Sequence, residues 1–363
     1  MHLRSLYLHN FRVYEEAHFE FCPRVNVISG PNAVGKTTIL EAIHFLAFGR
    51  SFRTSQVQDL IRQGAPYFYI EAIFEKHGIE QKLKISTDGK ERRIIYNSTP
   101  CQSFTTLIGL LPLVAITPDD ASLVKGAPNI RRHFLDLQIA QVDPFYVHTL
   151  TRYSRAMRQR NYLLRAKNPS TIESWEHEMA HAASYLCRQR HAAAVDLQRC
   201  GSALYRGLSG EDKDLLLNYK NSAPVASGED PVKHYYLQQY QKLRRREMDL
   251  GYTLSGPHKD DLVIEIGKGE ARFFASEGQQ RSVVAALHLA EWERLNTLAG
   301  DAPLLLIDDL GISLDSVRRE KLIAHAATVG QVFLTSTQDV NVDAEKKHLE
   351  LVEGTRDGRD KGT

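Results

Sequence analysis

The residues with the clearest chemical purpose form a glycine-rich segment near the start of the chain. Residues 30–37 fit the pattern G-x-x-x-x-G-K-[ST], which is typical of a phosphate-binding loop. An apolar, β-branched run at 25–28 precedes this loop, and apolar residues at helical spacing follow it at 38–46. In a strand–loop–helix unit, backbone N–H groups and the helix N-terminus bind phosphate oxygens. The context therefore predicts nucleoside triphosphate binding rather than an ordinary glycine-rich turn.

The side chains of this loop have separate predicted roles. Lys36 would contact the β- and γ-phosphates of ATP, and the Thr37 hydroxyl would ligate Mg²⁺. The other residues predicted to bind ATP here are Gly30, Pro31, Asn32, Ala33, Val34, Gly35 and Thr38.

Two carboxylates near the C-terminus are expected to complete the nucleotide site. Residues 304–307 are an unbroken apolar run, as in a buried parallel strand, and Asp308 and Asp309 follow directly. Ligands of open α/β sheets bind at the carboxyl ends of the strands. Asp308 is predicted to ligate Mg²⁺ and Asp309 to orient the attacking water, so that with Lys36 they form the predicted catalytic set. The alternative is a core strand that ends in two solvated acids.

A third candidate anion site lies at residues 276–281, where a helix over 279–298 is predicted to begin. A Ser-x-Gly-Gln segment offers a hydroxyl, free backbone N–H groups and a positive helix end. Read alone, it predicts only a helix capped by Ser276. Because the phosphate loop already holds the nucleotide of its own chain, we expect contact with the γ-phosphate of a partner's nucleotide. The residues assigned to that contact are Ser276, Gly278, Gln279 and Gln280.

Composition excludes several classes of protein. The 363 residues favour two domains, and 42% hydrophobic with 25% charged residues is typical of globular proteins. No apolar run approaches the ~20 residues of a membrane span, and the N-terminus lacks the apolar core of a signal peptide. The four cysteines have no C-x-x-C spacing, so neither a zinc site nor a disulfide framework is indicated. A cytoplasmic location without a membrane partner is therefore expected.

The order of predicted elements indicates an α/β domain interrupted by helices. Strand-like runs and one helix fill the first part of the chain, and long helices are predicted over 143–167 and 171–207. Strand and helix patterns alternate again after residue 262. We predict a discontinuous ATPase domain from 1–110 and 250–363, and a mostly helical domain from 111–249. The tail after residue 339 is charged and is expected to be frayed.

Local charge, rather than the net charge of +2, would carry any affinity for nucleic acid. Between residues 151 and 200, nine Lys and Arg face four acids, and a second basic cluster lies at 242–246. Arg152, Arg155 and Arg158 drift by ~60° from one to the next round a helix, ~120° in all, and so form a slanted stripe suited to a phosphate backbone. A solvated helix face is the alternative.

Taken in order, these motifs resemble a known group of proteins. The phosphate loop, the Ser-x-Gly-Gln segment, the Asp-Asp strand and Asp315 are similar to the ABC-type ATPase head of SMC-like DNA repair proteins. Within that group the chain resembles the RecF family, most specifically over 118–136. The resemblance extends from residue 3 to residue 339, with further matching segments at 8–12, 49–54 and 255–261.

The resemblance implies an ABC-ATPase-like P-loop domain with an inserted helical domain, which dimerises on ATP and binds duplex and gapped DNA. It further implies weak, DNA-dependent ATP hydrolysis and a role in DNA replication, gap repair and the SOS response, in which the protein helps RecO and RecR to load RecA at single-strand gaps. By position, Arg12 would contact ATP phosphates, and Asp315 would belong to the D-loop between two active sites. The residues that would contact DNA are Arg53, Arg131, Arg132, Arg152, Arg155 and Arg158.

Two departures from the family pattern bear on function. Ile312 and Ser313 stand where the family usually has Ser and Glu, and residues 335–337 lack the switch histidine of ABC ATPases. An ATP-binding subunit of an ABC-type transporter is the alternative function, because it shares the phosphate-loop and Ser-x-Gly-Gln logic. The basic helical insertion and the missing histidine argue against it. A third possibility is a scaffold in which ATP joins two copies without being hydrolysed.

Overall fold

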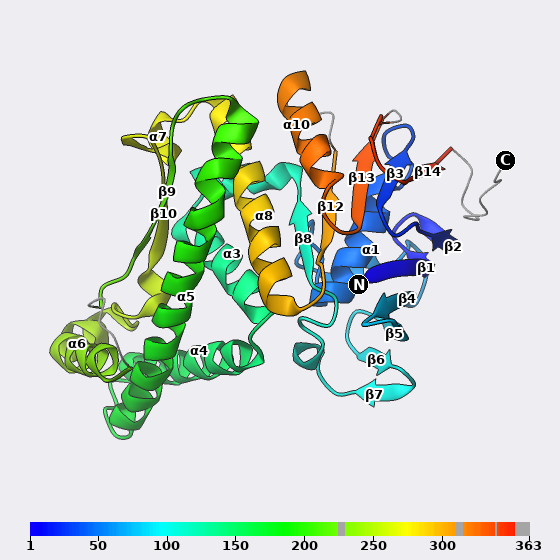
Figure 1. Cartoon of the computed structure of the whole chain (residues 1–363). Coiled ribbons are helices and arrows are strands. Elements are labelled where there is room, and N and C mark those ends of the chain that lie inside the picture. The colour runs from blue at the N-terminus through cyan, green and yellow to red at the C-terminus, as the bar shows by residue number, and fades with distance from the viewer. Residues whose placement is uncertain (224–228, 310–314, 338–339, 353–363) are drawn as a thin grey trace. The chain divides into compact units, whose positions relative to one another are not determined.

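Two compact units make up the chain, and each is assembled from separate stretches of sequence. In this computed structural model, unit 1 contains residues 1–121, 204–212 and 276–363, and unit 2 contains residues 122–203 and 213–275 (Figure 1). The structure describes residues 1–223, 229–309, 315–337 and 340–352.

A parallel sheet of five strands forms the centre of unit 1, in the order β14-β3-β13-β12-β8. Residues of β3 and β12 are buried throughout, which explains why both read as unbroken apolar runs. The strands are β3 (Val25–Ser29), β8 (Leu113–Ile116), β12 (Leu304–Ile307), β13 (Val332–Ser336) and β14 (Lys346–Glu350).

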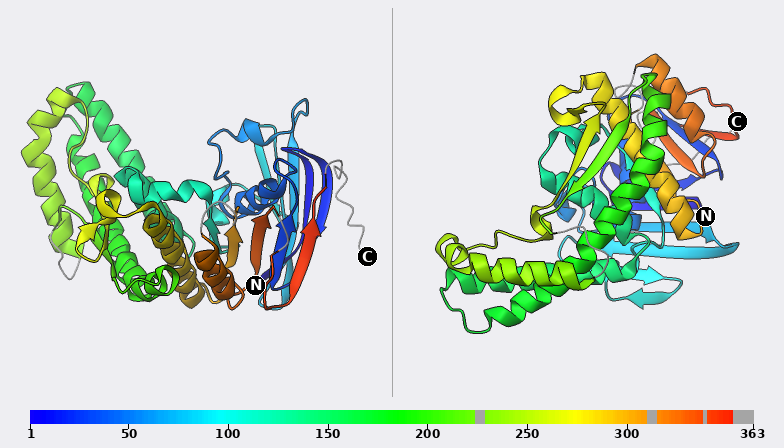
Figure 2. Two further views of the ribbon diagram at one scale, coloured as in Figure 1. Left: turned by 90° about the horizontal axis from the view of Figure 1, so that it is seen from above. Right: turned by 60° about the vertical axis from the view of Figure 1, so that its left-hand side comes forward.

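The second sheet of unit 1 is antiparallel and has the order β2-β1-β4-β5-β6-β7. Its strands are drawn in dark blue to cyan in Figure 2. Buried and less buried positions alternate along β4, as expected for a sheet with one face on the core. Its strands are β1 (His2–Phe11), β2 (Tyr14–Glu20), β4 (Phe68–Lys76), β5 (Ile79–Thr87), β6 (Arg92–Tyr96) and β7 (Thr99–Cys101).

Helix α1 (Lys36–Phe48) contacts strands of both sheets of unit 1 and is buried from Thr38 to Phe48. Helix α8 (Glu277–Ala299) packs on β8, and α10 (Ser316–Ala326) comes after β12 along the chain. Short 3-10 turns complete the unit: η1 (Val57–Leu60), η2 (Phe104–Thr106) and η3 (Pro118–Asp120).

Unit 2 combines helices with a small antiparallel sheet, β11-β10-β9. Its strands are β9 (Leu215–Lys220), β10 (Asp261–Ile266) and β11 (Gly269–Glu270). Its helices are α2 (Ala121–Lys125), α3 (Pro128–Ala140), α4 (Pro144–Arg165), α5 (Ile172–Ser209), α6 (Glu229–Leu250) and α7 (Ala271–Phe274), with the turn η4 (Pro257–Lys259). The 38-residue α5 starts in unit 2 and ends in unit 1.

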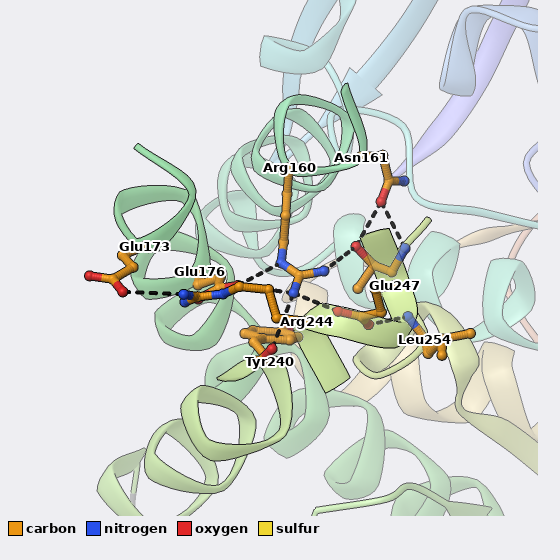
Figure 3. A network of polar contacts seen from close by, with 9 residues as sticks. Arg160, Asn161, Glu173, Glu176, Tyr240, Arg244, Glu247 and Leu254 are labelled. Carbon is orange, nitrogen blue, oxygen red and sulfur yellow. Dashed lines mark hydrogen bonds and ion pairs between the residues drawn. The ribbon is translucent and has the colours of Figure 1, made fainter. Parts of the chain in front are cut away.

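A fully buried arginine ties three helices of unit 2 together (Figure 3). Arg160 of α4 donates from Nη2 to Glu176 Oε1 of α5 at 2.9 Å and to Glu247 Oε2 of α6 at 2.6 Å. Its Nη1 donates to Thr253 Oγ1 at 2.9 Å, and Arg244 of α6 also binds Glu176. We call Arg160, Glu176, Glu247, Thr253 and Arg244 the Arg160 network. Because buried charges are costly unless paired, each charged group of this network depends on the others for its partner.

The unit boundaries differ from the predicted ones. Strand β8 was assigned to the helical domain, but it pairs with β12 in the parallel sheet of unit 1. Residues 250–275 were assigned to the ATPase domain, but β10 pairs with β9 in unit 2. The tail was expected to be frayed after residue 339, yet residues 346–350 form β14 beside β3. These boundaries are set by the pairing of strands that lie far apart in the sequence, and local sequence patterns do not show which strands pair.

Candidate nucleotide-binding site

The phosphate loop adopts a conformation that only glycine permits at its two ends. Gly30 has φ 143° and Gly35 has φ 113°, in the region that residues with a side chain avoid. A Cβ atom on Gly35 would lie 2.7 Å from Tyr14 Oη, and one on Gly30 would overlap the Leu351 carbonyl oxygen. Gly35 caps the N-terminus of α1, so the loop leads directly into the helix. Pro31, Asn32 and Ala33 between them are exposed.

Lys36 lies folded over this loop. Its Nζ donates to the carbonyl oxygens of Gly30 and Pro31, both at 2.7 Å. Partial burial lowers the pKa of Lys36, while the negative charges of Asp309 and Asp308 raise it. The ammonium group is therefore held against the loop, within electrostatic reach of the two carboxylates that follow β12.

The parallel sheet brings Thr37 and Asp308 together although 271 residues separate them. Thr37 Oγ1 donates to Asp308 Oδ1 at 2.8 Å, and Thr335 Oγ1 at the end of β13 donates to the same oxygen at 2.7 Å. Burial raises the pKa of Asp308, and the two hydroxyl groups lower it. Asp309 has φ 54°, and its backbone N–H donates to Thr335 Oγ1 at 2.7 Å. The carboxyl ends of β3, β13 and β12 thus form one polar edge, which is the edge where open α/β sheets bind ligands.

These side chains fit a magnesium ion. Among the described residues there is no group of three or more His, Cys, Asp or Glu side chains that could hold a metal by itself. Mg²⁺ in nucleotide sites needs fewer protein ligands, because phosphates and waters supply the rest of its shell. Thr37 and Asp308 provide the hydroxyl and the carboxylate that would hold it, and the ion would neutralise phosphate charge there.

The Ser-x-Gly-Gln segment is exposed at Ser276 and built as a helix cap. Ser276 Oγ accepts from the Gln279 backbone N–H at 3.3 Å, and Gln279 Oε1 accepts from the Ser276 N–H at 2.9 Å. The Gln279 side-chain amide donates to Glu211, also in unit 1, at 2.8 Å, and Gln280 is buried. The capping interpretation of Ser276 thus describes the single chain, and contact with a partner's nucleotide stays a prediction.

Asp315 and Gly278 lie on either side of one arginine. Asp315 caps α10 and accepts from Arg318 Nη1 at 2.6 Å, and a Cβ on Gly278 would lie 2.7 Å from that same nitrogen. Asp315, predicted to belong to the D-loop, and Gly278 of the Ser-x-Gly-Gln segment therefore both lie next to Arg318. The departures at Ile312 and Ser313 lie outside the described residues.

Arg12 and Arg53, predicted to contact phosphates and DNA, share a buried acid on α1. Arg12 donates from Nε and Nη2 to the two carboxylate oxygens of Glu41, at 2.9 and 2.7 Å. Arg53 Nη1 lies 3.9 Å from Glu41 Oε2, and the Ser51 hydroxyl donates to Oε1. We call these four residues the Glu41 cluster.

The other candidate DNA contacts differ in how far they reach solvent. Arg152, Arg155 and Arg158 are exposed, with buried Tyr153 and Ala156 on the opposite face of α4, so the predicted stripe exists. Arg152 makes a two-bond pair with Glu178, at 2.6 and 2.8 Å. Their contact with DNA remains a prediction.

The arginines of α3 are committed to protein partners. Arg132 is half-buried and donates to the Asp260 carbonyl at 2.6 Å. Arg131 is buried, pairs through two bonds with Asp261 at 2.8 and 2.9 Å, and donates to the Gly126 carbonyl. The prediction that Arg131 contacts DNA is wrong, because its guanidinium is enclosed by its own unit.

Sequence reasoning missed three residues of this site. Thr335 was noted only as a departure from the switch histidine, although its hydroxyl binds Asp308. Tyr14 covers Gly35, and Glu41 anchors two arginines. A signal existed for Glu41 alone, since it is an acid inside the apolar helix segment 39–48.

Comparison with known proteins decides the family. The family model for the RecF/RecN/SMC N-terminal domain matches residues 2–357. "DNA replication and repair protein RecF" of Protochlamydia amoebophila is 55% identical over 355 residues, 97% of this chain and 99% of that protein. The chain belongs to the RecF family. A second RecF, from Chlamydia abortus, is 37% identical over 339 residues, 93% of this chain and 92% of its own length.

Solved structures agree with this assignment. The structure described as the recombination mediator protein RecF-ATPrS in the RecFOR pathway has TM-score 0.88 and 29% identity, covering 96% of each chain. The corresponding RecF-ATP structure has TM-score 0.87 and 28% identity, covering 94% and 93%. An SMC head bound to the winged-helix domain of ScpA has TM-score 0.57 at 18% identity, covering 93% and 90%, and shows the fold alone. The predicted fold class, an ABC-type ATPase head of the SMC kind, is confirmed.

None of the helices in the described part of the chain has the length and apolar character needed to cross a membrane.

Proposed function

We propose that this chain is an ATP-dependent DNA-binding protein of DNA replication and recombinational gap repair, working in the cytoplasm. One observation carries the proposal: Thr37 of the phosphate loop donates to Asp308 across the parallel sheet, beside Lys36. A hydroxyl–carboxylate pair that would hold Mg²⁺ and a lysine that would bind phosphate thus stand together, which supports the proposal. RecF relatives of the same fold carry ATP in their names, which supports ATP as the nucleotide.

ATP is proposed to drive dimerisation. Ser276 is exposed at the N-terminus of a helix, where backbone N–H groups and the helix dipole favour an anion. A second chain's γ-phosphate at this position would join two copies and place Asp315 and Arg318 near the junction. Asp309 would orient water for a weak hydrolysis that dissolves the dimer.

The proposed role of the dimer is to bind duplex and gapped DNA, and with RecR and RecO to help load RecA. The exposed stripe of Arg152, Arg155 and Arg158 supports phosphate contact. The names of the relatives, DNA replication and repair protein and recombination mediator of the RecFOR pathway, support the biological setting.

The alternative of a transporter ATP-binding subunit loses its support, because the family model covers residues 2–357 and no switch histidine stands at 335–337. The non-hydrolysing scaffold differs from our proposal only in turnover, so a single-turnover measurement separates the two.

Sedimentation velocity with and without ATP, combined with a steady-state ATPase assay, tests the proposal. We expect a monomer without nucleotide, a dimer with ATP, and a higher ATPase rate when duplex DNA is added. Lys36→Ala is the matched control and should stay monomeric under all conditions. A chain that remains monomeric in saturating ATP, with a hydrolysis rate indifferent to DNA, would contradict the proposal.

A further inference from the structure

A small pocket lies between α4 and α5 of unit 2, and none of its lining residues belongs to the nucleotide motifs. Its volume is about 140 Å³. The lining consists of Phe145, Thr149 and Arg152 of α4 and His181, Ala182 and Tyr185 of α5. An engineered apolar cavity of about 150 Å³ in another protein holds benzene. The pocket is therefore large enough for a single six-membered ring.

Two of the lining side chains are aromatic and pack against each other. Phe145 and Tyr185 meet edge to face, with ring centroids 4.9 Å apart and ring planes at 89°. The Tyr185 hydroxyl donates to Asp143 Oδ2 at 2.6 Å, and Asp143 also caps α4, so Tyr185 is tied to the start of that helix. Phe145, in contrast, is 53% exposed although it is a large apolar residue. An aromatic ring that is supported on one side and open to solvent on another is suited to stacking with a planar ligand.

Polar groups of the pocket accompany these two rings. Arg152 donates from Nε and Nη2 to Glu178, at 2.6 and 2.8 Å, which fixes one edge of its guanidinium. Its Nη1 has no hydrogen-bond partner among the residues that the structure describes, and the side chain is 47% exposed. His181 is exposed as well. These groups can hydrogen-bond the carbonyl and N–H edge of a heterocyclic ring, which a hydrocarbon side chain lacks.

Arg152 belongs both to this pocket and to the basic stripe of α4. The stripe continues from Arg152 to the exposed side chains of Arg155 and Arg158. A phosphate backbone bound by the stripe therefore passes next to the pocket. Bases of a duplex are paired and stacked, and turning one outward costs free energy, whereas bases of a single strand can splay out onto aromatic side chains.

We propose that the pocket holds one unpaired pyrimidine base of a single-stranded stretch, while the stripe binds the adjoining phosphates. Phe145 stacks on the base, and Arg152 and His181 bind its polar edge. The proposal rests on the proposed function, and it adds a site that distinguishes a gap from a duplex. A phenylalanine side chain of a partner protein has a similar size, but it would leave the polar groups of the pocket without a ligand.

Fluorescence anisotropy with three DNA probes, measured in ATP, tests the proposal. The probes are a duplex, the same duplex with a gap of thymines, and the same gap built from abasic sites. We expect the thymine gap to bind about tenfold more tightly than the abasic gap, as for one base stacked on an aromatic side chain. Phe145→Ala should remove this preference and leave duplex binding unchanged. Equal affinity of the unaltered chain for the two gaps, or a Phe145→Ala variant that keeps the preference, would overturn the proposal.

Tyr162→Ala is the matched control, because Tyr162 is also an aromatic residue of α4, 64% exposed, but does not line the pocket. It should keep the full preference for the thymine gap. If Tyr162→Ala removes the preference as Phe145→Ala does, stacking is not specific to the pocket and the proposal fails. Should Phe145→Ala not fold, His181→Ala alters an exposed position of α5 and should reduce the preference in the same direction.

Photocrosslinking locates the base directly. A gap that contains 5-iododeoxyuridine, irradiated in complex with the chain and analysed by mass spectrometry, should crosslink to Phe145, His181 or Tyr185. Crosslinks confined to other segments would overturn the proposal. So would an NMR titration in which N-acetylphenylalaninamide, but not thymidine, shifts the His181 ring signals, because the pocket would then take the side chain of a protein.

Failure of the proposed function gives a different result from failure of this inference. A chain that binds none of the three probes, with or without ATP, contradicts both. ATP-dependent binding of the duplex without any preference for the thymine gap contradicts the pocket proposal alone.

Discussion

In each unit a buried glutamate binds arginines, and the two networks that result differ in their access to solvent. In the Arg160 network of unit 2, the side chains of Arg160, Glu247 and Glu176 are exposed by 0%, 0% and 2%, and Arg244 at its edge by 22%. In the Glu41 cluster of unit 1, Glu41 is equally buried, but Arg12 is 22% and Arg53 48% exposed. The glutamate–arginine pairing around Arg160 is therefore shielded from solvent, whereas the pairing around Glu41 has one half-exposed arginine, Arg53.

This difference separates a role in the fold from a role in function. A fully buried ion pair leaves an uncompensated charge when one partner is removed, and no ligand can replace that partner. A network with a half-exposed arginine can exchange a protein contact for a phosphate without exposing its buried acid. We therefore expect the Arg160 network to determine stability and the Glu41 cluster, together with the nucleotide motifs, to determine the response to ligands.

The largest effect on stability should follow from Arg160→Met. Removing the guanidinium leaves Glu247 and Glu176 buried without their shared donor, which costs about 3–5 kcal/mol. Urea denaturation followed by circular dichroism measures the loss. Arg244→Met, which removes only a partly exposed partner of Glu176, should cost about 1 kcal/mol or less. An equal loss of unfolding free energy in the two variants would show that burial of Arg160 does not set its contribution to stability.

Changes in the nucleotide site should alter ATP binding and hydrolysis rather than stability. Lys36→Ala should weaken ATP binding by at least about tenfold, since a hydrogen bond to a charged group is worth ~1.5–3 kcal/mol. Asp309→Asn should keep ATP bound and slow hydrolysis by about a hundredfold, at the lower end of general acid–base effects. Isothermal titration calorimetry and single-turnover hydrolysis measure the two quantities. Equal loss of ATP binding in both variants would contradict the separate roles.

A smaller effect, confined to assembly, is expected for Ser276→Arg. The exposed hydroxyl is predicted to reach a partner's nucleotide, so monomer ATP binding should persist while ATP-driven dimerisation weakens by about tenfold, as for one lost hydrogen bond to a charged group. Sedimentation equilibrium measures the dimer.

A mixture of Ser276→Arg with Lys36→Ala sharpens this test. Each variant spoils a different half of the composite site, so the mixed dimer retains one site with intact residues from both chains. Loss of ATP binding by monomeric Ser276→Arg would show that Ser276 acts within its own chain.

The smallest effects should come from the surface stripe of α4. Changing Arg152, Arg155 and Arg158 together to Glu should weaken DNA binding equally across sequences, since phosphates carry no base information. The slope of log K against log [salt] should fall by about 0.9 for each lost contact, about 2.7 in total. Arg152 already pairs with Glu178, which limits its share.

A charge-matched control is available on α6, where Lys242, Arg245 and Arg246 are also exposed. Their reversal should change the salt slope less than reversal of the stripe, as measured by fluorescence anisotropy with duplex DNA. If the salt slope falls in the α6 variant and is unchanged in the α4 variant, α6 contacts DNA and our assignment to α4 is wrong.

The sequence alone was sufficient for the features that depend on local chemistry. Residues 30–37 require their glycines and Lys36 at fixed spacing, and the apolar strand before Asp308 identifies the second half of the site. Helical periodicity likewise predicted that Arg152, Arg155 and Arg158 share one face, because the 3.6-residue repeat is a property of the backbone.

Only the tertiary structure decided which charged side chains are enclosed. Arg131 and Arg132 are neighbours in the sequence, yet one is buried against Asp261 and the other half-buried beside Asp260. The position of β14 beside β3 depends on backbone pairing across more than 300 residues. Glu41 acquires its role from Arg12 and Arg53, which lie on separate segments. Burial and pairing are set by which segments the folded chain brings together, and no local pattern encodes that choice.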